Sequence, residues 1–253
     1  MPRRVALSLA CLSILSATAA AMVGGAPTES GEIARHVVLV VGSRGNSCTG
    51  VAIARDLVLT AAHCVLPGAD YKLLDYDAAR RPLLKDVTRV ALHPQFDVNS
   101  MLAHRATADV ALLKLAEALP AAMAPAALGT RVPTTAGEPF VVAGFGVTVR
   151  GDGRTGGTLR AARLIATGRP GSLQLRLMDA ATRNDRAGLS ACTGDSGAPV
   201  FEDTRDAVIG VVSWSTGPKN SAGCGGLTGV TPIARYRDWI IDMANKLGSP
   251  LPP

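Results

Sequence analysis

The segment CTGDSGAP, from Cys192 to Pro199, sets a serine within a tight turn that has a glycine on either side. By itself the segment predicts only a sharp turn of the chain, because glycine, aspartate and serine all favour turns. Two other segments have to be considered with it. LTAAHC, residues 59–64, ends an apolar run at His63, and ADVALLKL, residues 108–115, starts another with Asp109. Alone, His63 is read as a structural or surface histidine and Asp109 as the cap of a strand.

Short apolar runs rich in valine and isoleucine recur along the chain, with Gly, Asn, Asp and Pro clusters between them. The runs are residues 36–41, 51–59, 110–115, 140–143, 173–178 and 207–214. This pattern predicts an all-β architecture of short strands. Helical periodicity occurs only near the end, on a face made by Ile233, Tyr236, Ile240, Met243 and Leu247. We therefore expect a terminal helix packed on a β-body.

The length and composition allow a folded protein with real cores, since 47% of the 253 residues are hydrophobic and 18% are charged. Residues 117–133 are rich in alanine and proline and lack a strand pattern. They divide the chain into an expected N-terminal half, residues 22–125, and a C-terminal half, residues 126–253. A cleft between the two halves is the expected site.

The first 21 residues differ from the rest, because Arg3 and Arg4 precede an uncharged stretch that ends in three alanines at 19–21. This layout is typical of a secretory signal peptide. A membrane anchor is the alternative, but the apolar run is short and no basic stop follows it. We expect a secreted or periplasmic protein without a stable anchor.

Four cysteines remain after the expected processing, namely Cys48, Cys64, Cys192 and Cys224. An even number in an exported chain predicts two disulfides, with three pairings open. Zinc is the rival, but the wide spacings lack a paired-ligand motif, so no metal and no cofactor is expected. The net charge of +6 comes from scattered arginines without an aromatic platform, which disfavours a nucleic-acid partner.

Taken together, His63, Asp109 and Ser196 occur in an order that resembles the trypsin/chymotrypsin family of serine proteases. The resemblance extends to three further segments, which are MVGG at 22–25, GFG at 144–146 and VSW at 212–214. It covers nearly the whole processed chain. The family's fold is two six-stranded antiparallel Greek-key barrels with the active site between them and a C-terminal helix. The resemblance also implies the pairings Cys48 with Cys64 and Cys192 with Cys224.

The same resemblance implies a role for each residue of the motifs. A serine hydroxyl is a weak nucleophile at neutral pH, so His63 would act as the general base for Ser196. Asp109 would orient the imidazole, and Ser213 would bond that carboxylate. The N–H groups of Gly194 and Ser196 would form the oxyanion hole. The expected activity is that of a secreted serine endopeptidase that forms an acyl-enzyme.

Alignment on the serine motif places Ser190 at the base of the primary pocket, where trypsin-like members have aspartate. A neutral base disfavours Arg and Lys, so we expect cleavage after apolar residues. Trp214 would line the cleft, Ser215 stands where the family usually has glycine, and Gly229 would form the opposite wall. The longer segment before Cys224 is a departure from the family.

By resemblance, Asp195 would receive the amine of Met22 after processing. A cut after Ala21 would expose that amine, although the family's usual basic residue before the cut is missing here. We expect a monomer whose partners are polypeptide substrates and a proteinaceous inhibitor. Two alternatives stay open: a binding protein that keeps the fold without catalysis, and a hydrolase that acts on esters.

Overall fold

In the computed structural model of the protein, residues 22–77, 79, 81–131, 135–168, 173–204 and 207–251 are described. The expected signal peptide, residues 1–21, lies outside the described residues. Within the described ranges, no helix combines the length and the apolar character needed to cross a membrane.

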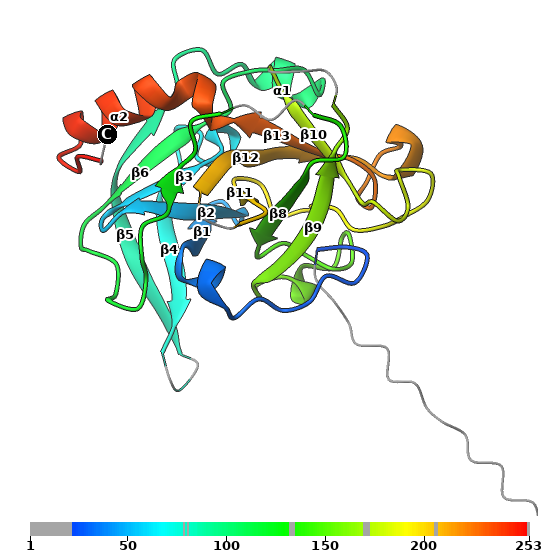
Figure 1. Ribbon diagram of the computed structural model, residues 1–253. Helices are drawn as coiled ribbons and strands as arrows, with labels where there is room; N and C mark the ends of the chain where they lie inside the picture. The colour runs from blue at the N-terminus through cyan, green and yellow to red at the C-terminus, as the bar shows by residue number, and fades with distance from the viewer. Residues whose placement is uncertain are drawn as a thin grey trace, which may run out of the picture.

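The first half of the chain forms a closed antiparallel barrel (Figure 1), with its strands in the order β1-β2-β3-β6-β5-β4. The strands are β1 (Val37–Gly42), β2 (Ser47–Ala54), β3 (Leu57–Thr60), β4 (Tyr71–Tyr76), β5 (Pro82–Leu92) and β6 (Ala111–Leu115). A short helix, α1 (Val98–Leu102), precedes β6 and is capped by Asp97, whose Oδ1 accepts the N–H of Asn99 at 2.9 Å. The expected single run 51–59 is two strands, because the chain turns at residues 55–56.

The second half forms a second closed ring of antiparallel strands, in the order β11-β8-β9-β10-β13-β12, which the pairing of β12 with β11 closes. Its strands are β8 (Pro139–Gly144), β9 (Arg160–Ala166), β10 (Leu175–Met178), β11 (Pro199–Glu202), β12 (Ala207–Ser215) and β13 (Thr228–Pro232). A two-residue strand, β7 (Ala127–Leu128), adds to β12 in parallel. The predicted fold of two six-stranded antiparallel barrels is confirmed.

The two ends of the described chain pack on the barrel of the other half. Met22 and Ala26 are fully buried among residues of the second barrel. The terminal helix α2 (Arg237–Lys246) lies against the first barrel in Figure 1, and Ile240 is buried in a core that also contains Leu112. The same core includes Phe201 of β11, so the apolar interior continues from one barrel to the other. This shared core fixes the relative position of the two barrels and of the loops between them.

Candidate active site

Neighbouring strands of the first barrel bring His63 and Asp109 together. His63 lies in a 3₁₀ turn, Ala62–Cys64, that follows β3, and Asp109 lies just before β6. Because β3 and β6 pair with Thr60 opposite Ala111, the end of one strand lies beside the start of the other. The register of the sheet therefore positions both side chains, although they are far apart in sequence.

Asp109 is fully buried and accepts three hydrogen bonds. Its Oδ1 accepts the backbone N–H of His63 at 3.0 Å, and its Oδ2 lies 2.8 Å from Nδ1 of the same residue. Ser213 of β12 donates its hydroxyl to Oδ2 at 2.5 Å. These contacts fix the imidazole plane and turn Nε2, which lies 4.0 Å from Cys64 Sγ, toward the other side of the ring from Asp109.

The turn that carries Ser196 is anchored to the first barrel through Thr49 of β2. The N–H of Thr49 donates to the carbonyl of Ser196 at 2.8 Å, and its hydroxyl donates to the carbonyl of Gly194 at 2.9 Å. Gly197 has a φ of +78°, and a Cβ there would lie 2.1 Å from Thr60 Oγ1. Only glycine fits this close approach between the barrels.

His63 and Ser196 line one cleft of about 310 Å³, together with Gly194, Trp214 and Ser215. Among the described residues, no hydrogen bond joins the Ser196 hydroxyl to His63, and no acceptor bonds the N–H groups of Gly194 and Ser196. The positive φ of Gly194, +95°, shapes the turn that holds these two amides. The cleft thus combines a hydroxyl, an oriented imidazole and two available N–H donors.

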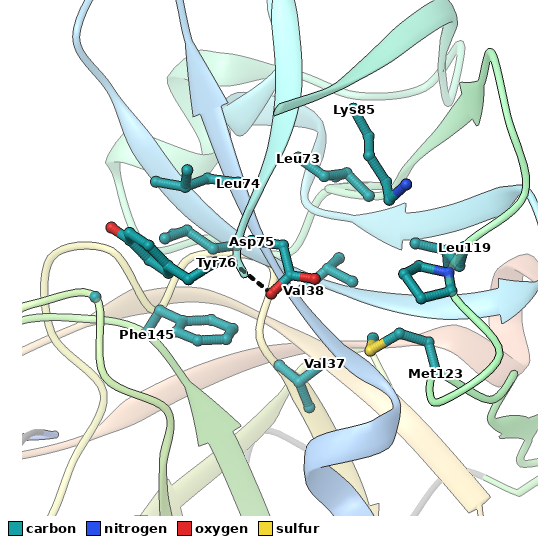
Figure 2. A pocket seen from close by; sticks show the side chains of 13 residues that line it. Val37, Val38, Leu73, Leu74, Asp75, Tyr76, Lys85, Leu119, Met123 and Phe145 are labelled. Atoms are coloured by element: carbon teal, nitrogen blue, oxygen red, sulfur yellow. Dashed lines mark hydrogen bonds between the residues drawn. The ribbon is translucent and has the colours of Figure 1, made fainter. Parts of the chain in front are cut away.

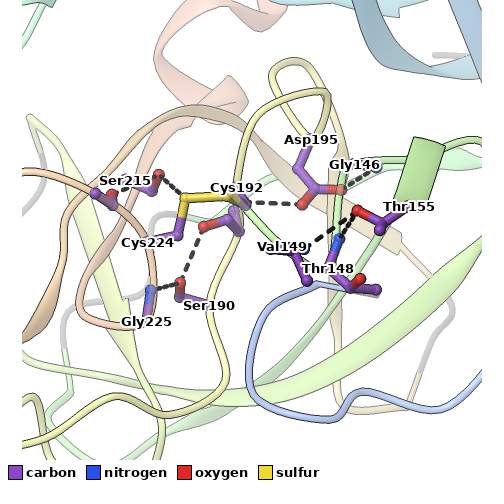
Figure 3. Close-up of a disulfide and its surroundings, with 12 residues drawn as sticks. Gly146, Thr148, Val149, Thr155, Ser190, Cys192, Asp195, Ser215, Cys224 and Gly225 are labelled. Carbon is purple, nitrogen blue, oxygen red and sulfur yellow. Dashed lines mark hydrogen bonds between the residues drawn. A yellow bond between two sulfur atoms is a disulfide. The ribbon is translucent and has the colours of Figure 1, made fainter. Parts of the chain in front are cut away.

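Two disulfides flank the cleft. Cys48 pairs with Cys64 beside His63, and Cys192 pairs with Cys224 in the second barrel (Figure 3). Of the three pairings that the sequence left open, the structure forms the one that the resemblance implied. The described residues contain no cluster of His, Cys, Asp and Glu that could hold a metal ion.

Asp195 points away from the cleft into the second barrel. Its Oδ1 accepts the N–H of Gly146 at 2.8 Å, and its Oδ2 accepts the N–H of Cys192 at 2.9 Å (Figure 3). Burial raises the pKa of this carboxyl from 3.8 to about 7, although both N–H groups oppose the shift. No cation pairs with Asp195 within the described part of the chain.

Ser190 and Gly229, the expected base and wall of the primary pocket, are not among the residues that line the cleft. Ser190 is fully buried, and its Oγ accepts the N–H of Gly225 at 2.6 Å (Figure 3). Thr228 Oγ1 accepts the N–H of Ala191 at 3.0 Å. Gly229, the expected opposite wall, pairs with Trp214, and a Cβ at this position would lie 2.0 Å from Trp214 Cε2. Its lack of a side chain thus makes room for the indole ring.

Sequence reasoning missed the groups that cover Trp214. His104 stacks on the indole with ring centroids 4.5 Å apart, and the Arg176 guanidinium lies 5.6 Å from its centroid. Neither residue belongs to a motif, and they come from different barrels, so only the folded chain brings them together. The anchoring role of Thr49 was missed for the same reason.

Comparisons with known proteins give matches over most of the chain. The profile of the Trypsin family matches residues 22–240. Vitamin K-dependent protein C of Mus musculus is 29% identical over an alignment of 243 residues, and the match covers 87% of this chain and 51% of that protein. A trypsin of Phaedon cochleariae is 28% identical, with 76% of this chain and 77% of that protein covered. The snake venom serine protease rhinocerase 4 of Bitis rhinoceros is 27% identical, and the match covers 90% of this chain and 90% of that protein.

The chain spans about half the length of the protein C relatives that it matches. Among solved structures, neuropsin, a serine protease expressed in the limbic system of mouse brain, matches with a TM-score of 0.63 at 22% identity. The match covers 83% of this chain and 94% of neuropsin, and at this identity it supports the fold. With the family profile covering most of the described chain, the protein belongs to the trypsin family of serine proteases.

Proposed function

We propose that this chain is an exported endopeptidase that hydrolyses peptide bonds through an acyl-enzyme at Ser196. The observation that carries the proposal is the buried carboxylate of Asp109 bonded to His63 Nδ1, in the cleft that also holds Ser196. The two unbonded N–H groups of Gly194 and Ser196 support it. The test is acyl transfer that depends on Ser196, measured with a peptide substrate and a fluorophosphonate label.

In the acylation step, Ser196 Oγ attacks the peptide carbonyl carbon while its proton passes to His63 Nε2. The carbonyl oxygen becomes an oxyanion, which accepts hydrogen bonds from the N–H groups of Gly194 and Ser196. The C–N bond then breaks, and the proton on Nε2 passes to the leaving amine. The products of this step are an ester that joins the amino-terminal fragment to Ser196 and a free carboxy-terminal fragment with a new amine.

In the deacylation step, water takes the place of the leaving amine. His63 Nε2 accepts a proton from this water, whose oxygen attacks the ester carbonyl, and the same two N–H groups bind the second oxyanion. The C–O bond to Ser196 breaks, and its oxygen regains the proton from His63. A carboxylic acid product leaves, and the enzyme returns to its starting state.

The preferred residue before the scissile bond is apolar in this proposal. Ser190 brings no charge to the pocket base, so a buried Arg or Lys would lose its hydration without a counter-charge. In a peptide library, we expect kcat/KM after Arg or Lys to be at least about 100-fold below that after apolar residues. The variant Ser190→Asp should narrow this gap. A library profile dominated by basic residues in the wild-type protein would contradict the proposal.

Export followed by a cut after Ala21 is the proposed route to the active form. Two disulfides support export, because such bonds persist in oxidising compartments. Met22 is fully buried in the core cluster that also contains Ala191 and Ala198, which lie on either side of Asp195 in sequence. In the processed protein, the Met22 ammonium would then supply the cation that Asp195 lacks. The expected partners are polypeptide substrates and a proteinaceous inhibitor, and the expected state is a monomer.

This route predicts that the free energy of unfolding depends on pH differently in the two chain lengths. With residues 1–21 attached, the unfolded chain loses the Asp195 proton near pH 4, whereas the folded chain keeps it to about pH 7. The free energy of unfolding should therefore fall as the pH rises through this window, by on the order of 4 kcal/mol. In a chain that starts at Met22, the ion pair removes this loss. Activity should instead decline when the pH rises above the raised pKa of the amine, whose ordinary value is about 8.

Urea unfolding of both chain lengths between about pH 4 and 9 measures these slopes. Asp195→Asn in the longer chain is the control, because an amide does not titrate and the part of the slope that Asp195 contributes should vanish. Equal slopes below pH 7 in the two wild-type chains would show that the Met22 amine does not pair with Asp195. Mass and amino-terminal sequencing of the exported protein establish where the chain is cut.

A further inference from the structure

The catalytic cleft continues into a groove that the proposed chemistry does not use. Asn46, Ser47 and Thr193 line the cleft beside His63 and also line an adjoining groove of about 450 Å³. From there the groove runs along the first barrel past Val41 and Leu74. Any ligand that extends from the cleft on this side enters the groove directly.

The groove ends at a smaller apolar pocket of about 90 Å³ (Figure 2). Leu39, Leu74, Tyr76 and Phe145 line both the groove and this pocket. Figure 2 shows Leu74, Tyr76 and Phe145 at one side of the pocket, with Leu119 and Met123 at the other. We call this feature the end pocket. The cleft, the groove and the end pocket thus form one continuous surface.

The surface beside the end pocket is unusually apolar for an exposed hairpin. Tyr76 of β4 is 48% exposed, and Leu83 and Leu84 of β5, which pair with Asp75 and Leu74 of β4, are 46% and 55% exposed. Exposed apolar groups gathered at a concave site are typical of a binding surface. Asp75 and Lys85 also line the end pocket, and their opposite charges cancel. The occupant is therefore selected by apolar contact and not by charge.

The position of the groove fixes which part of a substrate would enter it. Ala191, Cys192, Trp214 and Ser215 also line the cleft. In the proposed function, the acyl side of the substrate lies over these residues. Asn46, Ser47 and the Cys48–Cys64 disulfide line the opposite end, so the leaving-group side must lie over them. The chain that follows the scissile bond is thus directed into the groove.

We propose that the end pocket is an exosite for the polypeptide substrate, which binds an apolar or aromatic side chain downstream of the scissile bond. This proposal rests on the proposed peptidase function and adds a second determinant of substrate choice. An extended segment can follow the groove, because alternate side chains would face the apolar lining while the others face solvent. Anchoring the downstream segment would select among proteins that share the same cleavage residue.

The experiment uses peptides with one common sequence up to the scissile bond and a glycine-serine tail after it. One phenylalanine is moved stepwise along the tail, and kcat/KM is compared with that of a short ester that lacks any tail. We expect one tail position to raise kcat/KM about tenfold in the wild-type protein. Tyr76→Ser and Met123→Ser should remove this gain. Leu173→Ser, at an exposed residue of the second barrel that lines none of the three cavities, should keep it.

The short ester separates the two levels of the proposal. If the wild-type protein fails to turn over the ester in a Ser196-dependent way, the peptidase function itself is wrong. If the ester is turned over but no tail position gives a gain, the exosite is overturned. A gain in kcat/KM that both Tyr76→Ser and Met123→Ser leave intact also overturns the exosite. The same holds if kcat/KM is equal for all tail positions and the protein self-associates in a way that Tyr76→Ser abolishes.

Discussion

Ser196→Ala is expected to lower kcat for a peptide substrate by about 10⁵- to 10⁶-fold while the protein stays folded. Alanine cannot form the acyl-enzyme, so His63 and the two N–H groups have no covalent intermediate to serve. A residual rate above that in water should persist, because the N–H groups of Gly194 and residue 196 still bind an oxyanion. The loss should appear in kcat, since Ser196 Oγ contributes a bond made only in the reaction.

Single-turnover kinetics and labelling with a fluorophosphonate measure this effect together. The wild-type protein should take up one label at Ser196, and Ser196→Ala should take up none. Ser30→Ala is the matched control, because Ser30 is exposed and lies in the N-terminal segment away from the cleft. Labelling that persists in Ser196→Ala, or a wild-type protein that is never labelled, would favour a binding protein that merely keeps the fold.

The site was largely predictable because short segments encode it. Three local patterns can be recognised without knowledge of tertiary contacts. They are the turn residues around Ser196, the apolar run that ends at His63 and the apolar run that starts after Asp109. The strands of the barrel cores were predictable for the same reason: β3 and β6 are almost fully buried and read as continuous apolar runs.

Two of the strands that the apolar pattern missed, one exposed and one buried, show why it failed. β5 is the longest strand of the first barrel, but most of its side chains are exposed, so its sequence has no apolar run. β13 begins with Thr228 and Gly229, which are buried through hydrogen bonding and close packing and not through apolar side chains. Pairing with neighbours stabilises such strands, and a pattern search along one segment does not detect it.

The groove and the covering of Trp214 were beyond sequence reasoning for a different reason. Tyr76 and Phe145 come from separate barrels and meet only after both have closed. His104 and Arg176 approach one indole ring from segments 72 residues apart in the numbering. Surfaces assembled in this way carry no local spacing, so their discovery depends on coordinates.

Asp109→Asn is expected to lower kcat by about 10⁴-fold with little change in folding stability. The carboxylate accepts hydrogen bonds at both oxygens, from the His63 backbone at Oδ1 and from Nδ1 and Ser213 at Oδ2. An amide has a single oxygen, so one orientation sets its NH₂ group against Nδ1. The imidazole then carries its proton on Nε2 and cannot accept the proton of Ser196.

Ser213→Ala is the comparison that separates this tautomer effect from simple loss of a contact. It removes one donor to Asp109 Oδ2 and keeps the carboxylate, so kcat should fall only about 10- to 100-fold. Urea unfolding of both variants checks that the buried network still folds. If the two substitutions instead reduced kcat equally and modestly, the role of Asp109 would be to pack the loop. The proton transfer assigned to His63 would then not depend on the charge of the Asp109 carboxylate.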